Sequence, residues 1–102
     1  MDYQVRLSHS ARVDIEEIVR YISIDDRKQA LRFGRLLIQH TKSLAQLPER
    51  GRVLPEIGDR NVREIIVRAY RIVYRLNHDE RLVEVIRVWH AARGIPNLTP
   101  LN

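Results

Sequence analysis

The chain of 102 residues has an apolar content of 44%, enough for one modest core, and we predict a single domain spanning residues 1–102. It has no cysteine, and its four scattered histidines lack metal-ligand spacing, so we expect no disulfide, no thiolate chemistry, no metal and no other cofactor. The net charge of +5 rests on arginine, with Lys28 and Lys42 as the only lysines, and suits an acidic protein partner or nucleic acid.

The N-terminal segment Tyr3–Ser8 alternates apolar and polar side chains, with Tyr3, Val5 and Leu7 sharing one face. This pattern predicts a first strand with one buried face, and its polar second face favours an edge position in the sheet. No apolar segment typical of secretory signals precedes it, and no run is long enough to cross a bilayer. We therefore expect a cytoplasmic protein without a membrane partner.

Two amphipathic helices are predicted next. The first follows a capping serine, Ser8 or Ser10, and its apolar side chains recur at three- and four-residue spacing from Ala11 to Ile22. The segment Ile24–Arg27 interrupts this pattern, and a longer helical repeat runs from Gln29 until Pro48. The short connection predicts that the two helices form an antiparallel hairpin.

The second half of the chain is predicted to form a loop and three strands. The segment from Pro48 to Asp59 contains two prolines and two glycines, which indicates a loop that crosses back to the sheet. Val62–Arg68 then supplies a strand, and a β-hairpin follows, in which Tyr70–Leu76 and Leu82–His90 flank five polar residues. The tail after Gly94 has two prolines and no charge, and we predict irregular structure there.

The pairing register of this hairpin decides which side chains share a face of the sheet. In one register two arginines face each other, which is unfavourable. In the other, Arg75 lies opposite Glu84, and the face that carries Arg71 and Arg75 also carries His90, while the tyrosines join Trp89 in the core. We prefer this second register, although a bulge in the hairpin would change the assignment.

The order strand, helix, helix, strand, strand, strand predicts an α+β fold. In this fold the two-helix antiparallel hairpin packs on one face of a mostly antiparallel, four-stranded sheet. The opposite face of the sheet is expected to stay open. In the preferred register this open face carries the candidate site residues Arg71, Arg75, Glu84 and His90.

Four segments together carry a resemblance to a known group of proteins. YQVRLSHSARVDIEEIVRYI and ALRFGRLLIQHTKSLAQLPERGR cover the first strand, both helices and the following loop, whereas VREIIVRAYRIVYRL and VIRVWHAARG are the most specific matches. In this order they resemble the RelE/ParE superfamily of bacterial type II toxins, from Tyr3 to Gly94. The resemblance implies the β-α-α-β-β-β fold of that superfamily.

The same resemblance implies a small toxin that a cognate antitoxin protein neutralises in a tight complex, with operator DNA bound only through the antitoxin. RelE-like members cut messenger RNA in the ribosome, whereas ParE-like members inhibit DNA gyrase and block replication. The segment RVWHAARG looks more like ParE-like sequences. We therefore favour gyrase inhibition, with ribosome-dependent RNA cleavage as the alternative and an inactive homologue acting as a binding module or co-repressor as a second alternative.

The resemblance also suggests roles for individual residues. Arg71 occupies the position at which nuclease members stabilise the scissile phosphate, and His90 lies where some place a general acid or base. The tail lacks the ionisable and aromatic residues that nuclease members commonly carry there, which favours protein binding over catalysis. For binding, we expect Arg71, Arg75, Glu84 and Arg93 to contact the target or the antitoxin. As alternatives, Arg71 pairs with a carboxylate, His90 is a structural hydrogen-bonding residue, and Arg93 contacts helix carbonyls.

Overall fold

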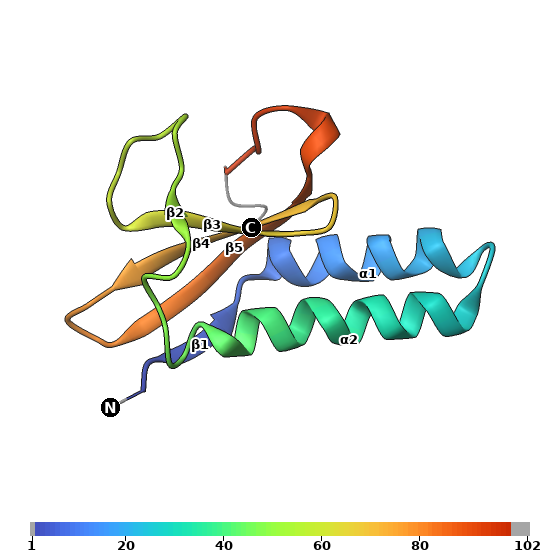
Figure 1. The fold of residues 1–102 in the computed structure, drawn as a ribbon, viewed down its shortest axis with the longest axis horizontal. Helices are drawn as coiled ribbons and strands as arrows, with labels where there is room; N and C mark the ends of the chain where they lie inside the picture. Colours follow the sequence, from blue (N-terminus) through green and yellow to red (C-terminus); the bar gives the residue numbers. More distant parts are fainter. Residues whose placement is uncertain (1, 99–102) are drawn as a thin grey trace.

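The computed structural model describes residues 2–98 and places two helices against one face of a five-stranded sheet (Figure 1). The elements are β1 (Gln4–Leu7), α1 (His9–Ser23), α2 (Arg27–Ser43), β2 (Arg52–Val53), β3 (Val62–Val67), β4 (Tyr70–Asn77), β5 (Leu82–His90) and the 3-10 turn η1 (Ala91–Arg93). The strand order is β1-β5-β4-β3-β2, with β1 parallel to β5 and every other pair antiparallel. The predicted α+β fold is confirmed, but the sheet has five strands rather than four, because the loop predicted between Pro48 and Asp59 contains the two-residue strand β2.

The helix boundaries follow from their caps. The Ser8 hydroxyl accepts from the amide of Ala11 at 3.0 Å and starts α1, and the Asp26 carboxylate accepts from the amides of Lys28 and Gln29 and starts α2. The second helix therefore begins two residues before the predicted position, and it ends at Ser43 rather than near Pro48. Within residues 2–98, neither helix has the length and apolar character that crossing a bilayer demands.

The main core lies between the helical hairpin and the sheet. The side chains of β4 that point toward the helices are Ile72, Tyr74 and Leu76, together with the half-buried Tyr70. The helices contribute the buried side chains Ala11, Ile15, Ile18, Phe33 and Leu37, and the C-cap of α2 contributes Leu44. The predicted core positions of Tyr70 and Tyr74 are confirmed, and β1 lies at the edge of the sheet as expected.

A β-bulge divides the β4–β5 hairpin into two registers. Next to the turn, Arg75 pairs with Glu84 as predicted. Between Val73 and Tyr74 the register shifts, because β5 has one extra residue there, and beyond this point Arg71 pairs with Trp89. The bulge moves Trp89 from the predicted core face to the opposite face of the sheet.

The face of the sheet away from the helices is partly covered, so the prediction that it stays open is wrong. Leu54, Val62 and Val73 form a second buried cluster there, against which Leu98 of the C-terminal segment packs. Figure 1 shows the loop between β2 and β3 and the segment after β5 rising from this side of the sheet. Two layers therefore flank the sheet, a helical one and a thinner one made of loops.

The loop before β2 is held against the sheet by Tyr74. Its fully buried hydroxyl accepts a hydrogen bond from the amide of Gly51 at 2.9 Å, across the sheet edge. A Cβ atom at position 51 would lie 2.5 Å from both the Tyr74 hydroxyl and the carbonyl oxygen of Glu64, so only glycine fits. Burial raises the pKa of Tyr74, which keeps this hydroxyl neutral.

We predict that Tyr74→Phe lowers the free energy of unfolding by about 1–3 kcal/mol, because it leaves the buried amide of Gly51 without an acceptor. Tyr21→Phe is the matched control, since Tyr21 is 74% exposed, and it should change stability by less than about 0.5 kcal/mol. Urea unfolding followed by circular dichroism measures both. Equal effects of the two substitutions would show that the Tyr74 hydroxyl does not hold the loop.

Candidate functional site

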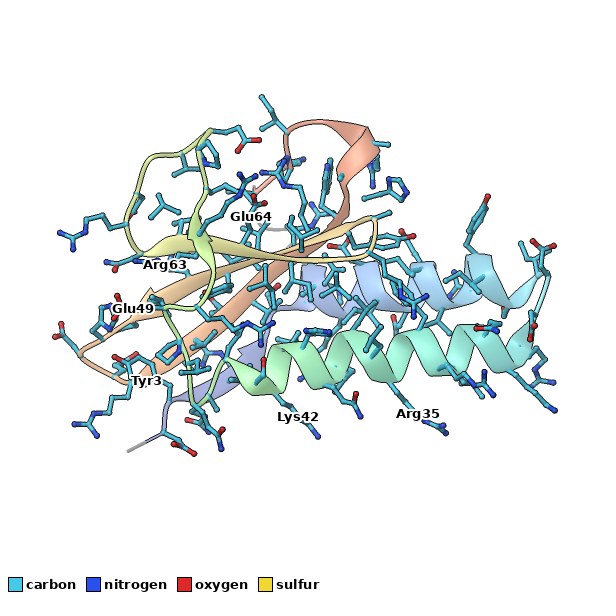
Figure 2. The ribbon with its side chains drawn as sticks, viewed as in Figure 1. Tyr3, Arg35, Lys42, Glu49, Arg63 and Glu64 are labelled. Atoms are coloured by element: carbon cyan, nitrogen blue, oxygen red, sulfur yellow. The ribbon has the colours of Figure 1, made fainter. Side chains whose placement is uncertain are left out.

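Arg71 is the central cation of the sheet face away from the helices. Its Nε donates to Oε1 of the buried Glu64 in β3, its Nη1 donates to the carbonyl of Gly94 at 3.2 Å, and its Nη2 donates to Oε1 of Glu56 at 3.0 Å. The second carboxylate oxygen of Glu64 accepts from Nε of Arg52 at 2.6 Å. One guanidinium thus ties β3, the loop after β2 and the C-terminal segment to β4. Of these partners, Glu64 is labelled in Figure 2.

The positive charge of Arg71 is already neutralised by carboxylates of its own chain. The hydrogen bond to Glu56 is the largest cause that raises the pKa of Arg71, and burial opposes it. The same hydrogen bond lowers the pKa of Glu56. The Arg71 side chain is only 8% exposed, so a substrate phosphate would have to displace two carboxylates to reach it. The carboxylates that pair with Arg71 are Glu64 and Glu56 of its own chain, rather than Glu84 or a carboxylate of an antitoxin, the two partners that the pairing alternative considered.

His90 lies on the other face of the sheet from Arg71. It pairs with Tyr70 across the hairpin, with their ring centroids 5.0 Å apart, and its Nδ1 accepts from the amide of Ala92 at 3.1 Å. His90 therefore caps η1 as a structural residue. The predicted grouping of His90 with the three charged residues is wrong, because the bulge exchanges the faces of β5 before the strand ends.

Arg87 forms a second buried ion pair that sequence reasoning missed. Its Nε and Nη2 donate to the two carboxylate oxygens of Asp14 in α1, each at 2.8 Å, and its Nη1 donates to the carbonyl of Asn97 at 2.7 Å. Asp14 also accepts from the amide of Val88 at 2.9 Å. The hydrogen bond to Asp14 is the main cause that raises the pKa of Arg87. One signal in the sequence could have revealed this pair. Asp14 is a carboxylate at helical spacing from the apolar side chains Ala11 and Ile18 of the first predicted helix.

Trp89 lies between two arginines on the same face as Arg71. The guanidinium carbon of Arg93 is 4.0 Å from the centroid of the indole ring, and that of Arg87 is 5.0 Å from it. Both distances fit cation–π contacts. Trp89 is 7% exposed, whereas Arg93 is exposed and keeps its outer side open to a partner.

Arg75 and Glu84 lie side by side, as predicted. Glu84 is 3.4 Å from Nη2 of Arg6 in β1 and 4.0 Å from Nη1 of Arg75, and the two arginine side chains are 60% and 55% exposed. One carboxylate shared by two exposed arginines leaves a net positive charge. These side chains border a cavity of about 460 Å³ that also reaches His9 and Leu98. This surface suits an acidic group of a partner.

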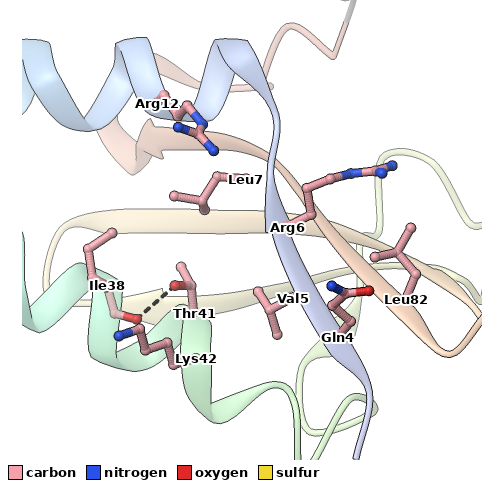
Figure 3. Close-up of a pocket in the computed structure, with 9 residues that line it drawn as sticks. All are labelled: Gln4, Val5, Arg6, Leu7, Arg12, Ile38, Thr41, Lys42 and Leu82. Carbon is pink, nitrogen blue, oxygen red and sulfur yellow. Dashed lines mark hydrogen bonds between the residues drawn. The ribbon is translucent and has the colours of Figure 1, made fainter.

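A second cavity, of about 340 Å³, lies where β1 meets the end of α2 (Figure 3). Its lining comes from β1, with Gln4, Val5, Arg6 and Leu7, from the helices, with Arg12, Ile38, Thr41 and Lys42, and from Leu82 of β5. Because β1 is an edge strand, its outer backbone groups have no strand beside them within the described sheet. Such an edge can pair with an extended segment of another chain.

The arrangement is suited to binding acidic groups and poorly suited to acid–base catalysis. Phosphodiester cleavage needs a base or acid and a cation within reach of one reacting centre. Arg71 and His90 project from opposite faces of the sheet, so they do not form such a pair. Among residues 2–98, no group of three or more histidine or acidic side chains could hold a metal ion.

We predict that Arg71→Ala and Arg75→Ala differ sharply in their effect on stability. Removal of Arg71 leaves Glu64 and Glu56 without their shared cation and should cost about 3 kcal/mol or more in the free energy of unfolding. Removal of the exposed Arg75 should cost less than about 0.5 kcal/mol. Chemical unfolding of both variants is the measurement. Similar stabilities would mean that Arg71 is free to contact a partner.

We also predict a pH-dependent effect of Glu56→Gln. Because its folded-state pKa lies below the ordinary value of 4.5, the charge of Glu56 stabilises the fold above that value, and this contribution disappears as the pH falls through the lowered pKa. The melting temperature of the variant should therefore be lower than that of the original chain at neutral pH and equal to it in acid.

Thermal unfolding between about pH 7 and about pH 3 tests the Glu56 prediction. The matched control is Glu16→Gln, which neutralises an exposed carboxylate of α1. A difference caused by Glu56→Gln that persists unchanged at the acidic end would show that the Glu56 charge does not contribute through Arg71.

Comparison of the sequence with models of known protein families gives a match. Residues 5–95 match the family model described as the ParE toxin of the type II toxin–antitoxin system parDE. Comparison with curated protein sequences gave no match.

Solved structures share the fold at low sequence identity. One chain of the toxin–antitoxin complex RelBE2 from Mycobacterium tuberculosis is 22% identical, with a TM-score of 0.68 over 88% of this chain and 99% of that one. A chain of the chromosomal ParDE system from P. aeruginosa is 16% identical, with a TM-score of 0.71 over 86% and 95%. A mutant of the E. coli toxin RelE in the free state is 18% identical, with a TM-score of 0.65 over 92% and 88%. Because the family model matches residues 5–95, which is most of the chain, the chain belongs to the ParE toxin family of type II toxin–antitoxin systems.

Proposed function

We propose that this toxin inhibits DNA gyrase by binding it, without catalysis of its own, and that a cognate antitoxin neutralises it. The observation that carries the proposal is the state of Arg71, whose guanidinium is buried and bound to Glu64, Glu56 and the Gly94 carbonyl. A ribonuclease of this fold would need that cation at the scissile phosphate. Here it serves the fold instead.

Two further features support binding over cleavage. His90 lies on the opposite sheet face from Arg71 and caps η1 through its Nδ1, so the two residues cannot act on one phosphate. The C-terminal residues after Gly94 have no ionisable or aromatic side chain that would replace them. The family match to a ParE toxin model agrees with this reading.

For the antitoxin, we propose an acidic segment that becomes ordered on the toxin. Two of the similar structures are described as toxin–antitoxin systems. The exposed arginines Arg6 and Arg75 offer charge for rapid encounter, and the unpaired edge of β1 offers backbone groups for strand pairing. Burial of apolar antitoxin side chains would supply most of the affinity. Operator DNA would then be bound through the antitoxin.

Two assays on the purified chain, run without antitoxin, test the target. We expect loss of gyrase supercoiling activity, together with intact messenger RNA on translating ribosomes. His90→Asn should retain this activity, because its side-chain oxygen can still accept from the amide of Ala92.

The opposite pattern would overturn the proposal. Codon-phased cleavage of messenger RNA with normal supercoiling, and loss of that cleavage in His90→Asn, would assign the chain to the ribonuclease branch. A chain that affects neither assay and still binds its antitoxin would be an inactive homologue.

A further inference from the structure

The outer face of α2 carries a straight row of four basic side chains and one glutamine. Residues Lys28, Arg32, Arg35, Gln39 and Lys42 follow one another at spacings of four, three, four and three, so they lie on one side of the helix. All five are exposed, and the buried side chains of α2 lie on the opposite side of it. Figure 2 shows Arg35 and Lys42 pointing away from the sheet. We call these five residues the α2 basic row.

The charges of the α2 basic row are not balanced by the protein. The helix Arg27–Ser43 contains no acidic residue, and none of the ion pairs within residues 2–98 involves a cation of this helix. By contrast, α1 mixes Arg12 and Arg20 with Glu16 and Glu17. A soluble surface commonly mixes both signs in this way. The row is therefore an uncompensated strip of positive charge.

This arrangement works against the stability of the helix. Lys28 lies in the first turn of α2, where the helix dipole disfavours a cation, typically by about 0.3–1 kcal/mol. Lys28 and Arg32, and then Arg32 and Arg35, are like charges at spacings of four and three residues, which repel each other. Because these charges disfavour the helix and form no ion pair within residues 2–98, a polyanionic partner explains them better than folding does.

We infer that the α2 basic row is a contact surface for the phosphate backbone of a nucleic acid duplex. The row spans 14 residue steps, or about 21 Å of helix. Over that length of duplex axis a single strand carries about six phosphates, one for about every 3.4 Å, so each of the four cations of the row has a phosphate within the same span. Charged groups and one amide, with no apolar or aromatic member, suit backbone contacts without base readout.

A protein partner is the competing occupant. It would require apolar anchors, and the row itself has no apolar member. Arg35, Gln39 and Lys42 of the row do line a cavity of about 410 Å³ together with the apolar Ile15, Leu31 and Ile38, so the test includes a protein partner as an outcome. The inferred contact goes beyond gyrase inhibition and does not depend on it. It differs from operator binding through the antitoxin, since the toxin itself supplies the cations.

The test compares two variants of equal charge. In the row variant, Arg32, Arg35 and Lys42 are each replaced by glutamine. In the control variant, glutamine replaces three exposed arginines outside the row, Arg20, Arg60 and Arg81. Fluorescence anisotropy with a labelled DNA duplex of arbitrary sequence, and with an RNA duplex of the same sequence, measures the affinity of the full chain across salt concentrations. Circular dichroism confirms that both variants remain folded.

We expect the row variant to bind at least about tenfold more weakly than the control variant. The slope of log affinity against log salt should fall by about three, close to one for each lost phosphate contact. Equal affinity for the two duplexes would support contacts with phosphate alone, and a preference for one would identify the source of the duplex.

Three results would overturn the inference. Equal losses of duplex affinity in the two variants would show that binding depends on net charge and not on the position of the row. Absence of duplex binding by the original chain at low salt would remove it. Unchanged duplex binding by the row variant, combined with weaker binding of the purified antitoxin, would assign the row to a protein partner.

Discussion

Neutralisation of two buried arginines is the constraint on which the loop side of this structure depends. A guanidinium removed from water is tolerated only when a carboxylate pairs with it and further acceptors satisfy its remaining donors. Arg71 meets this requirement through Glu64, Glu56 and the Gly94 carbonyl, and Arg87 meets it through Asp14 and the Asn97 carbonyl. Both arginines therefore hold the C-terminal segment against the sheet, and Arg87 also binds α1, which lies 73 residues away along the chain.

The same constraint divides the cations of this basic chain into two groups. Arg71 and Arg87 are buried, and their charges are used inside the protein. Arg6, Arg75 and the α2 basic row are exposed, and their charges remain available for acidic or phosphate groups outside it. The first group includes Arg71, which the resemblance places at the phosphate-stabilising position of nuclease members, and this is why we propose a toxin that acts by binding. The exposed cations of the second group contribute to the net charge of +5 without an acidic partner for each of them.

The bulge between Val73 and Tyr74 explains why the candidate site was only partly predictable. Alternation correctly placed Tyr70 and Tyr74 toward the helices, and charge pairing correctly placed Arg75 opposite Glu84. Both inferences are local, because they depend on neighbouring residues of one hairpin. The bulge inserts a single residue in β5 and reverses every later side chain, so His90 and Trp89 exchange faces relative to the prediction.

The sequence by itself determined the two amphipathic helices, every strand except β2, and the α+β class, because periodicity, caps and turn residues are local signals. The superfamily was indicated separately, by the resemblance of whole segments in order. The sequence also placed the excess positive charge. Only the tertiary structure decided that Glu64 and Asp14 are buried partners of Arg71 and Arg87, and that loops cover the second sheet face. The physical reason is that a buried charge is stabilised by whichever carboxylate the fold brings to it, and the partner of Arg87 lies 73 residues away along the chain.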